Sequence, residues 1–325
     1  MKVVFFSAQQ FEIASFNGVA HEHLISYYSE KLTADSVAMI PDGTQAVCVF
    51  VNDKLDKRCI AQLHKKKVKI IALRCAGFNH VDLLACQKYQ IRVVNVPHYS
   101  PYAVAEHAMA LILALNRKIH RAYHRVRDGN FDLNGLQGFD MHGKTVGIIG
   151  LGRIGQVFSG ICHGFGCHVI AFDPYVEHWP NVHMLPLNEL FTKADMISLH
   201  CPLNENTRHM INDETIGLMK DKVMLINTGR GALIESKALI KGLKSGKLLA
   251  VGLDVYEQES NLFFMDHSME VICDDILMRL VTFPNVIITS HQGFLTHEAL
   301  HEIALTTLNN LTLLEKGQNC RFELV

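Results

Sequence analysis

The sequence predicts an α/β protein with two domains, each built on a doubly wound parallel sheet. Short apolar runs alternate with longer amphipathic stretches along the chain, which is the pattern of β-α-β units. At 325 residues the chain is longer than one hydrophobic core usually supports. A glycine-rich turn at residues 150–155 directly follows one apolar run and opens a helical stretch. These three observations together indicate two sheets rather than one.

Five apolar runs of strand length occupy the first hundred residues. They lie at residues 3–6, 36–40, 46–51, 69–73 and 92–96. Helical spacing of apolar residues fills the gaps between them. Because parallel strands need long crossover connections, this alternation predicts a first parallel sheet covered by helices.

A second series of runs begins after a predicted helix over residues 103–117. Its strands are expected at residues 146–149, 169–172, 196–200, 223–228, 250–255 and 286–291. Six strands is the number in a complete dinucleotide-binding fold. The segment 295–315 is helical by spacing, and we expect it to pack back onto the first domain. The predicted domains are therefore 1–100 with 298–325, and 101–297. Residues 257–283 form an insertion whose course the sequence does not predict.

Composition and charge exclude several classes of function. The 31 basic and 32 acidic residues give a formal charge of −1, so the chain lacks the cationic field that binds nucleic acid without sequence specificity. No apolar segment has the length of about 20 residues that a bilayer needs, and no signal peptide is evident. The nine cysteines include no C-x-x-C pair and lie in apolar runs, which predicts reduced core thiols and a cytoplasmic location. We expect a small-molecule ligand, with no nucleic-acid or membrane partner.

The glycine-rich turn predicts a dinucleotide site. Gly150, Gly152 and Gly155 fit G-x-G-x-x-G between a strand and a helix. The first glycine permits a tight turn, the second lets the backbone approach a pyrophosphate, and the third allows close helix packing. Asp173 ends the next predicted strand, where a carboxylate accepts from a ribose hydroxyl and repels a 2′-phosphate. The pattern therefore favours NAD over NADP.

Three polar residues at predicted strand ends are candidates for catalysis. Arg230 lies in NTGRGALI, Glu259 in GLDVYEQES and His291 in TSHQGF. Because the carboxyl ends of strands in a doubly wound sheet converge on the ligand crevice, these side chains can meet although they are distant in sequence.

With these motifs the chain resembles the D-2-hydroxyacid dehydrogenase family over essentially its whole length. The shared features are the glycine fingerprint, an N-T-x-R-G segment, a D-V-[FYW]-x-x-E segment and a late histidine. Residues 74–82, 95–108, 197–207 and 291–296 are most similar to the fermentative D-lactate dehydrogenases. Ser260 stands where many relatives have proline, which again resembles the lactate branch. The resemblance implies an NAD-binding Rossmann domain inserted into a flavodoxin-like substrate domain, and reversible hydride transfer between NADH and pyruvate giving D-lactate.

Chemistry independently suits the three residues to the roles that the resemblance implies. Imidazole titrates near neutral pH, so His291 is expected to be the acid in reduction and the base in oxidation. Glu259 would favour the imidazolium form and orient the ring. Arg230 keeps its charge, and its planar fork fits the substrate carboxylate and the developing oxyanion.

The resemblance also implies further contacts. The backbone N–H groups of Ala76 and Gly77 would bind the substrate carboxylate, Tyr99 would add a hydroxyl, and Phe294 would form the wall beside the methyl group. The remaining positions that it assigns to the cofactor are Arg153, Ile154, Cys201, Pro202, Thr207, Thr228, Gly229 and Asp254.

Two other histidine patterns are interpreted as structural. His297 and His301 fit H-E-x-x-H, a zinc-binding helix motif, but Ala304 replaces the glycine of its longer form, so we expect no metal. His120 and His124 lie one turn apart among basic residues, which predicts an exposed or interface helix face.

Three alternatives remain open from the sequence. The substrate could be glyoxylate, hydroxypyruvate, phosphoglycerate or a branched 2-oxo acid. The fold could serve as an NADH-sensing binding module, against which the complete Arg, Glu and His set stands. A metal-dependent hydrolase is the third. Because relatives are dimers or tetramers, and the apolar stretch 103–115 could form a symmetric interface, we expect a homo-oligomer.

Overall fold

The computed structural model describes residues 1–325, apart from the side chain of Asn261. The chain forms two compact units, Met1–Ser100 with Leu295–Val325, and Pro101–Phe294. The predicted domains were 1–100 with 298–325, and 101–297. The chain therefore returns to the first unit three residues earlier than the sequence suggested.

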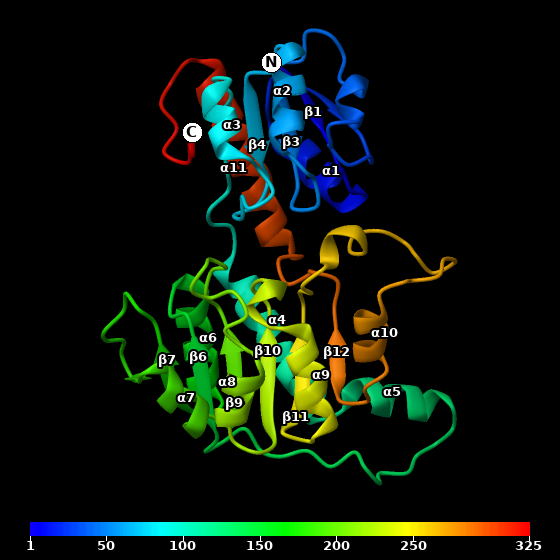
Figure 1. Cartoon of the computed structure of the whole chain (residues 1–325), viewed down its shortest axis with the longest axis vertical. Helices are drawn as coiled ribbons and strands as arrows, with labels where there is room; N and C mark the ends of the chain where they lie inside the picture. The colour runs from blue at the N-terminus through cyan, green and yellow to red at the C-terminus, as the bar shows by residue number, and fades with distance from the viewer. The chain divides into compact units, whose positions relative to one another are not determined.

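The first unit is a five-stranded parallel sheet (Figure 1). The strands lie in the order β2-β1-β3-β4-β5, which is the order of flavodoxin-like folds. Helix α11 packs against α1 and β4 and so joins the end of the chain to this unit. The elements are β1 (Lys2–Phe5), α1 (Gln10–Asn17), β2 (Leu24–Tyr27), η1 (Ser36–Met39), β3 (Ala46–Val49), α2 (Lys57–Lys65), β4 (Ile70–Leu73), α3 (Leu83–Lys88), β5 (Arg92–Val94) and α11 (His297–Glu315).

The second unit is a seven-stranded parallel sheet in the order β12-β11-β10-β9-β6-β7-β8 (Figure 1). Read from the other edge, this is the dinucleotide-binding order with one added strand, so the predicted fold class of two doubly wound parallel sheets is confirmed. The elements are α4 (Pro101–Asn116), α5 (Ile119–Arg127), β6 (Thr145–Ile149), α6 (Arg153–Gly164), β7 (His168–Phe172), β8 (His183–Met184), α7 (Leu187–Lys193), β9 (Met196–Leu199), α8 (Asp213–Leu218), β10 (Val223–Asn227), η2 (Gly231–Leu233), α9 (Ser236–Lys244), β11 (Leu248–Leu253), η3 (Glu259–Asn261), α10 (Asp275–Val281) and β12 (Val286–Ile288).

Alternating side chains of this sheet build a core on each face. Val146 and Ile148 of β6 pack with α4 and α6, whereas Ile149 packs into the core formed with α7, α8, α9 and α10. Successive strand residues point to opposite faces, so burial on both faces requires the continuous apolar runs seen in the sequence. The carboxyl ends of these buried strands carry the polar residues described below.

One predicted strand is wrong and two strands were not predicted. Residues 36–40 form the 3₁₀ helix η1 and its end, because the buried Val37 and Ile40 are three residues apart and share one side of a helix with three residues per turn. Strand β2 is a half-exposed edge strand, and β8 has only two residues, so neither has a recognisable apolar run. The predicted strand 286–291 ends at Ile288.

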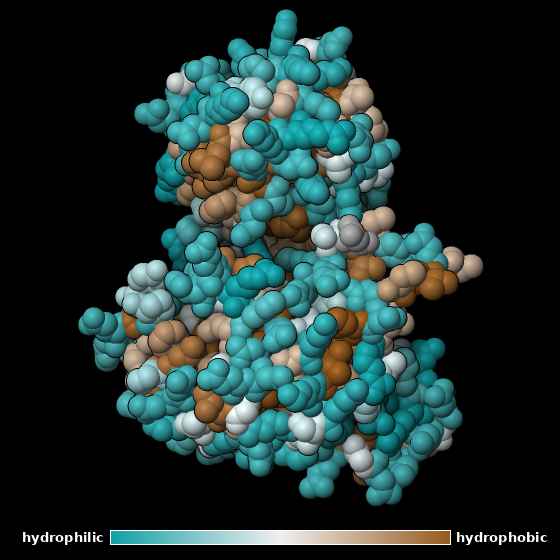
Figure 2. Space-filling view, viewed as in Figure 1, coloured by the Kyte–Doolittle hydropathy of each residue, from teal (hydrophilic) through white to brown (hydrophobic). Residues whose placement is uncertain are grey.

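The insertion at residues 257–283 contains η3 and α10, joined by a loop. Figure 2 shows hydrophobic side chains gathered on this loop, where Met265, Met269 and Val271 are exposed.

All nine cysteines are free, but Cys273 in this loop is exposed and is not the core thiol that the sequence predicted. No helix in the described part of the chain has the length and apolarity needed to cross a bilayer.

Candidate active site

The glycine turn joins β6 to α6 with a geometry that only glycine satisfies at two positions. Gly150 has φ +94°, and a Cβ there would lie 2.5 Å from the backbone nitrogen of Cys201. A Cβ on Gly155 would lie 2.1 Å from the carbonyl oxygen of Gly150. Either clash would be with backbone, which cannot move aside cheaply. The turn therefore requires glycine at both positions.

The start of α6 is open to a ligand. Gly152 caps the helix in an extended conformation, with no side-chain cap, and a Cβ there would meet nothing within 4 Å. The N–H groups of the first helical turn, which begins with Arg153 and Ile154, have no carbonyl partner within the helix. Their partial positive charge fits a pyrophosphate.

Asp173 lies beyond the end of β7 and supports the glycine turn. Its carboxylate accepts from Leu151 N at 2.7 Å and from Tyr175 N at 2.8 Å, one bond to each oxygen. An ionised carboxylate has about four lone-pair sites, so both oxygens can still accept from a ribose. Asp173 directly follows β7 rather than ending it, and its contact with a ribose stays a prediction.

Residues after β9 and β10 form the other side of this edge. Thr228 is buried, and its hydroxyl oxygen is buried with no hydrogen-bond partner among the described residues. An orphaned buried hydroxyl is a group that a bound ligand would satisfy, so this position fits the cofactor. Thr207 differs, because its hydroxyl donates to the carbonyl of Pro202 at 2.7 Å and accepts from Asn204 N at 2.8 Å within its own loop. Burial raises the pKa of Cys201 to about 11, so its thiol stays protonated.

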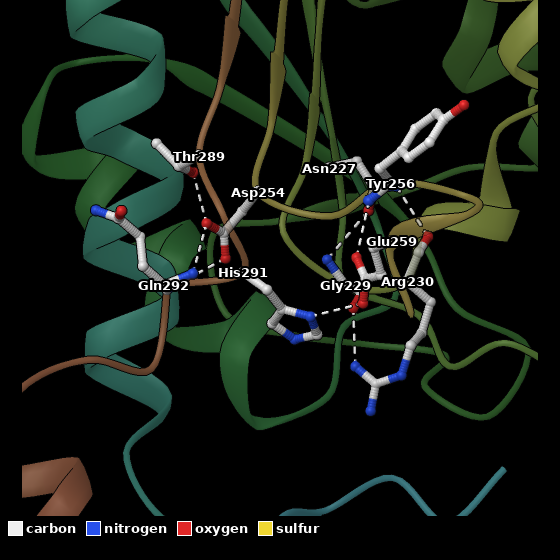
Figure 3. Close-up of polar contacts among 10 residues, drawn as sticks. Asn227, Gly229, Arg230, Asp254, Tyr256, Glu259, Thr289, His291 and Gln292 are labelled. Carbon is white, nitrogen blue, oxygen red and sulfur yellow. Dashed lines mark hydrogen bonds and ion pairs between the residues drawn. The ribbon is translucent and has the colours of Figure 1, made fainter. Parts of the chain in front are cut away.

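Glu259 and His291 form a hydrogen-bonded pair. His291 Nδ1 lies 2.8 Å from Glu259 Oε1, and both side chains are mostly buried. The other oxygen of Glu259 accepts from Tyr256 N at 2.9 Å, which anchors the carboxylate to the end of β11 (Figure 3). With Nδ1 directed at the carboxylate, Nε2 is the ring nitrogen left to exchange a proton with a ligand.

Arg230 lies beside this pair, at the end of β10 (Figure 3). Its Nη1 donates to the carbonyl of Gly229 at 2.8 Å, and Asn227 Nδ2 donates to the carbonyl of Arg230 at 2.9 Å. The next residue must be glycine, because a Cβ on Gly231 would lie 2.1 Å from the backbone of Tyr256. This close approach holds the Arg230 segment against the segment that carries Glu259.

Asp254 is a buried carboxylate at the end of β11. Burial by itself would raise its pKa, but hydrogen bonds from His107 and Thr289 outweigh that effect and leave the pKa below its usual value. Thr289 Oγ1 donates to it at 2.5 Å. Asp254 is therefore an ionised group inside the second unit.

The remaining predicted residues are placed as follows. Ala76 and Gly77 lie in the first unit, half-buried just beyond β4, where Asn95 Nδ2 donates to the carbonyl of Ala76 at 2.9 Å. Tyr99 is half-buried near the end of the same unit. Phe294, the last residue of the second unit, is only 7% exposed.

Sequence reasoning missed two residues beside the site. The ring of Phe264, in the insertion, lies 5.9 Å from the ring of His291 between centroids, and Phe264 has φ +66°. His107 of α4 contacts both Asp254 and Thr289. Phe264 belongs to no motif, and His107 lies in the segment 95–108 that resembles the family but was given no role. Only the fold brings these two side chains to the site.

Comparison with known proteins adds an independent result. Residues 109–293 match the family model described as D-isomer specific 2-hydroxyacid dehydrogenase, NAD binding domain. The chain is 49% identical to 2-hydroxyacid dehydrogenase A of Aspergillus oryzae, covering 100% of this chain and 95% of that protein. It is 47% identical to the D-lactate dehydrogenase of Escherichia coli, covering 100% of both. The apo structure of the Escherichia coli D-lactate dehydrogenase superposes with a TM-score of 0.91, covering 100% of both chains at 44% identity.

Proposed function

Because the chain belongs to the D-isomer specific 2-hydroxyacid dehydrogenase family and carries its NAD-binding domain, we propose that it is an NAD-dependent D-lactate dehydrogenase. The reaction is the reversible reduction of pyruvate by NADH to D-lactate. The single observation that carries the chemistry is the 2.8 Å pair between His291 and Glu259 at the carboxyl edge of the larger sheet. Relatives named D-lactate dehydrogenase support the choice of substrate.

The second unit supplies the residues that would hold the cofactor. The N–H groups at the start of α6 would bind the pyrophosphate, Asp173 the ribose, and Thr228 a polar group of the cofactor. Bound NADH supplies the hydride. The other residues proposed at this edge are Gly150, Gly152, Arg153, Ile154, Gly155, Cys201, Pro202, Thr207, Gly229 and Asp254.

His291 moves the proton of the reaction. In reduction, the protonated ring donates from Nε2 to the carbonyl oxygen of the 2-oxo acid as the carbonyl carbon is reduced, and it becomes neutral. In oxidation the neutral ring accepts that proton from the hydroxyl. Glu259 fixes the rotation of the ring through Nδ1 and would stabilise the positive charge that the ring carries as the acid.

Arg230 and the first unit would bind the substrate. Of the five N–H donors of the guanidinium, one is used by Gly229, so the others can hold the carboxylate and the developing oxyanion. We propose that the N–H groups of Ala76 and Gly77 and the hydroxyl of Tyr99 also bind the acid. Phe294 would form the wall beside the methyl group.

A steady-state assay tests this function. NADH oxidation would be followed with pyruvate, glyoxylate, hydroxypyruvate and a branched 2-oxo acid, with NADPH in parallel, and the product would be resolved by chiral chromatography. We expect the largest kcat/KM for pyruvate with NADH, and D-lactate as product. A preference of about tenfold or more for a bulkier acid would contradict the lactate assignment. NADH binding without turnover of any acid would instead indicate a sensor.

A histidine pair provides the matched control. His291→Asn should lower kcat by roughly 10²- to 10⁴-fold, because it removes the proton donor. His297→Asn changes an exposed histidine at the start of α11 and should leave turnover unaltered. No group of three potential metal ligands occurs among the residues that the structure describes, so a chelator should not affect either rate. Loss of turnover in the His297 variant or with chelator would support a metal enzyme.

We also propose that the chain forms a homo-oligomer, a dimer or tetramer, through α4. A groove of about 640 Å³ lies between α4 and α6 and is lined in part by Met109, Leu113, Val157 and Ile161. Leu113, Val157 and Ile161 are partly exposed, and their burial against a second copy would favour association. Light scattering should show a dimer or larger, and Leu113→Lys should dissociate it; a monomer at micromolar concentration would contradict the proposal.

A cytoplasmic, fermentative role completes the proposal. Reduction of pyruvate regenerates NAD from NADH, which is the chemistry that fermentation requires. The free, mostly buried cysteines are compatible with a reducing compartment. Fractionation of cells and measurement of D-lactate under oxygen limitation would test both points, and an unchanged D-lactate yield after deletion of the protein would contradict the role.

A further inference from the structure

The loop that carries His291 is wrapped around the carboxylate of Asp254. Gln292 N donates to Oδ1 at 2.9 Å (Figure 3). Gly293 N donates to Oδ2 at 2.8 Å. His291 N donates to the backbone carbonyl of Asp254 at 2.7 Å. Three consecutive N–H groups of this loop are therefore held by one buried residue, which determines the path of the loop.

That path places His291 in an unfavourable backbone conformation. His291 has φ +55°, in the left-handed region that residues other than glycine rarely adopt. Such a conformation persists only where its surroundings enforce it, and here it lets the ring reach Glu259. Gly293 must be small, because a Cβ there would lie 2.9 Å from Asp254 Oδ2. The orientation of the ring thus depends on the position of the Asp254 carboxylate.

His107 also contacts that carboxylate, at Oδ1. Its Nε2 lies 3.1 Å from Thr289 Oγ1 and 3.2 Å from Asp254 Oδ1. Since the Thr289 hydroxyl donates its proton to Asp254, its oxygen is left to accept from His107, which requires the proton on Nε2. His107 comes from α4, a helix of the same unit.

We propose that His107 is a positioning residue of the dehydrogenase, which holds Asp254 and Thr289 so that the loop presents His291 to Glu259. The described partners of His107 are Thr289 and Asp254 rather than His291 or Glu259, so it acts through the loop. This inference rests on the proposed function, because its effect is measured as turnover of the 2-oxo acid.

Four variants test the inference. His107→Ala removes the donor, His107→Gln returns an N–H near the position of Nε2, and Thr289→Val removes the bridging hydroxyl with little change of shape. Asn116→Ala is the control: this buried residue on the same helix makes two hydrogen bonds, to the backbone N–H and carbonyl of Phe139. It lies about 14 Å along α4 from His107.

Steady-state kinetics and hydrogen exchange distinguish positioning from loss of stability. A misplacement of the ring by about 1 Å lowers turnover by roughly 100-fold, so His107→Ala should reduce kcat on that scale. Thr289→Val should reduce kcat in the same direction, and His107→Gln should recover most of it. The amides of Gln292 and Gly293 should exchange about tenfold faster in His107→Ala. Asn116→Ala should lower Tm without either effect.

Each result decides the question. A kcat for His107→Ala within twofold of the parent, or unchanged amide exchange at Gln292 and Gly293, would overturn the inference. The inference would also be overturned if Asn116→Ala lowered kcat together with Tm, because loss of stability would then account for the loss of kcat. Should His107→Ala fail to fold, Thr289→Val and His107→Gln carry the same comparison. An inactive parent enzyme with every 2-oxo acid would refute the proposed function instead, while the exchange measurement would still test the role of His107 in the loop.

Discussion

Replacing Glu259 with glutamine tests the ion pair that supports catalysis. Glutamine keeps an oxygen that can accept from His291 Nδ1, but it removes the negative charge at 2.8 Å. Glu259→Ala removes both the charge and the acceptor, together with the bond from Tyr256 N. The two variants therefore separate the charge from the orientation of the ring.

The magnitude follows from the kind of hydrogen bond that is lost. A hydrogen bond to a charged group contributes about 1.5–3 kcal/mol, against about 0.5–1.5 kcal/mol for a neutral one. The difference of about 1–1.5 kcal/mol corresponds to roughly a tenfold loss of kcat in Glu259→Gln, since each 1.36 kcal/mol is tenfold. In Glu259→Ala the whole hydrogen bond to the charged group is lost, which corresponds to a decrease in kcat of about 10- to 150-fold. The value of kcat should therefore fall from the parent to Glu259→Gln and further to Glu259→Ala.

Glu257 offers a control of the same kind. Its Oε1 lies 2.7 Å from His209 Nε2, so it forms a similar pair two residues away in the same segment. Glu257→Gln should leave kcat unchanged, because neither member of this pair touches the reacting groups in the proposed mechanism. NADH oxidation with saturating pyruvate is the assay. A kcat for Glu259→Gln within threefold of the parent, or equal losses in both glutamine variants, would refute the reasoning.

Four further predictions concern specificity, stability and pH. Phe264→Ala opens space beside the ring of His291 and should raise the kcat/KM ratio of a branched 2-oxo acid to pyruvate by about tenfold; an unchanged ratio would exclude this ring from the pocket. Asp173→Asn should lower the ratio of kcat/KM with NADH to kcat/KM with NADPH, and an unchanged ratio would contradict the contact of Asp173 with the ribose. Arg74→Met leaves Glu12 buried without its partner and should lower the free energy of unfolding in urea by about 3–5 kcal/mol. Adding Glu12→Leu should recover part of this loss, and a double variant with no recovery would contradict the importance of the pair. Folding lowers the pKa of Asp254, so its contribution to stability is present above its usual pKa and is lost as pH falls through the lowered value. Asp254→Asn should therefore make the free energy of unfolding vary less with pH below about pH 4. The same pH dependence in parent and variant over this acidic range would contradict the shift.

Local patterns predicted most strands but failed where side-chain spacing was ambiguous. Residues 36–40 have the composition of a strand, yet Val37 and Ile40 are buried on one side of a 3₁₀ helix. An apolar run of five residues is compatible with either periodicity, and only its neighbours decide between them. The two-residue strand β8 has too few side chains to show any period.

The sequence by itself determined the glycine turn, because the positive φ of Gly150 and the contact of Gly155 with Gly150 arise within one strand-to-helix connection. It also predicted that Glu259 and His291 lie together, as the structure has them, since both follow buried strands whose ends meet in a parallel sheet. Only the tertiary structure decided how His291 is held. His107 is separated from Thr289 by 182 positions in the chain, and a hydrogen bond across that distance leaves no periodic or compositional signal. Phe264 likewise reaches the ring through an insertion that has no regular pattern.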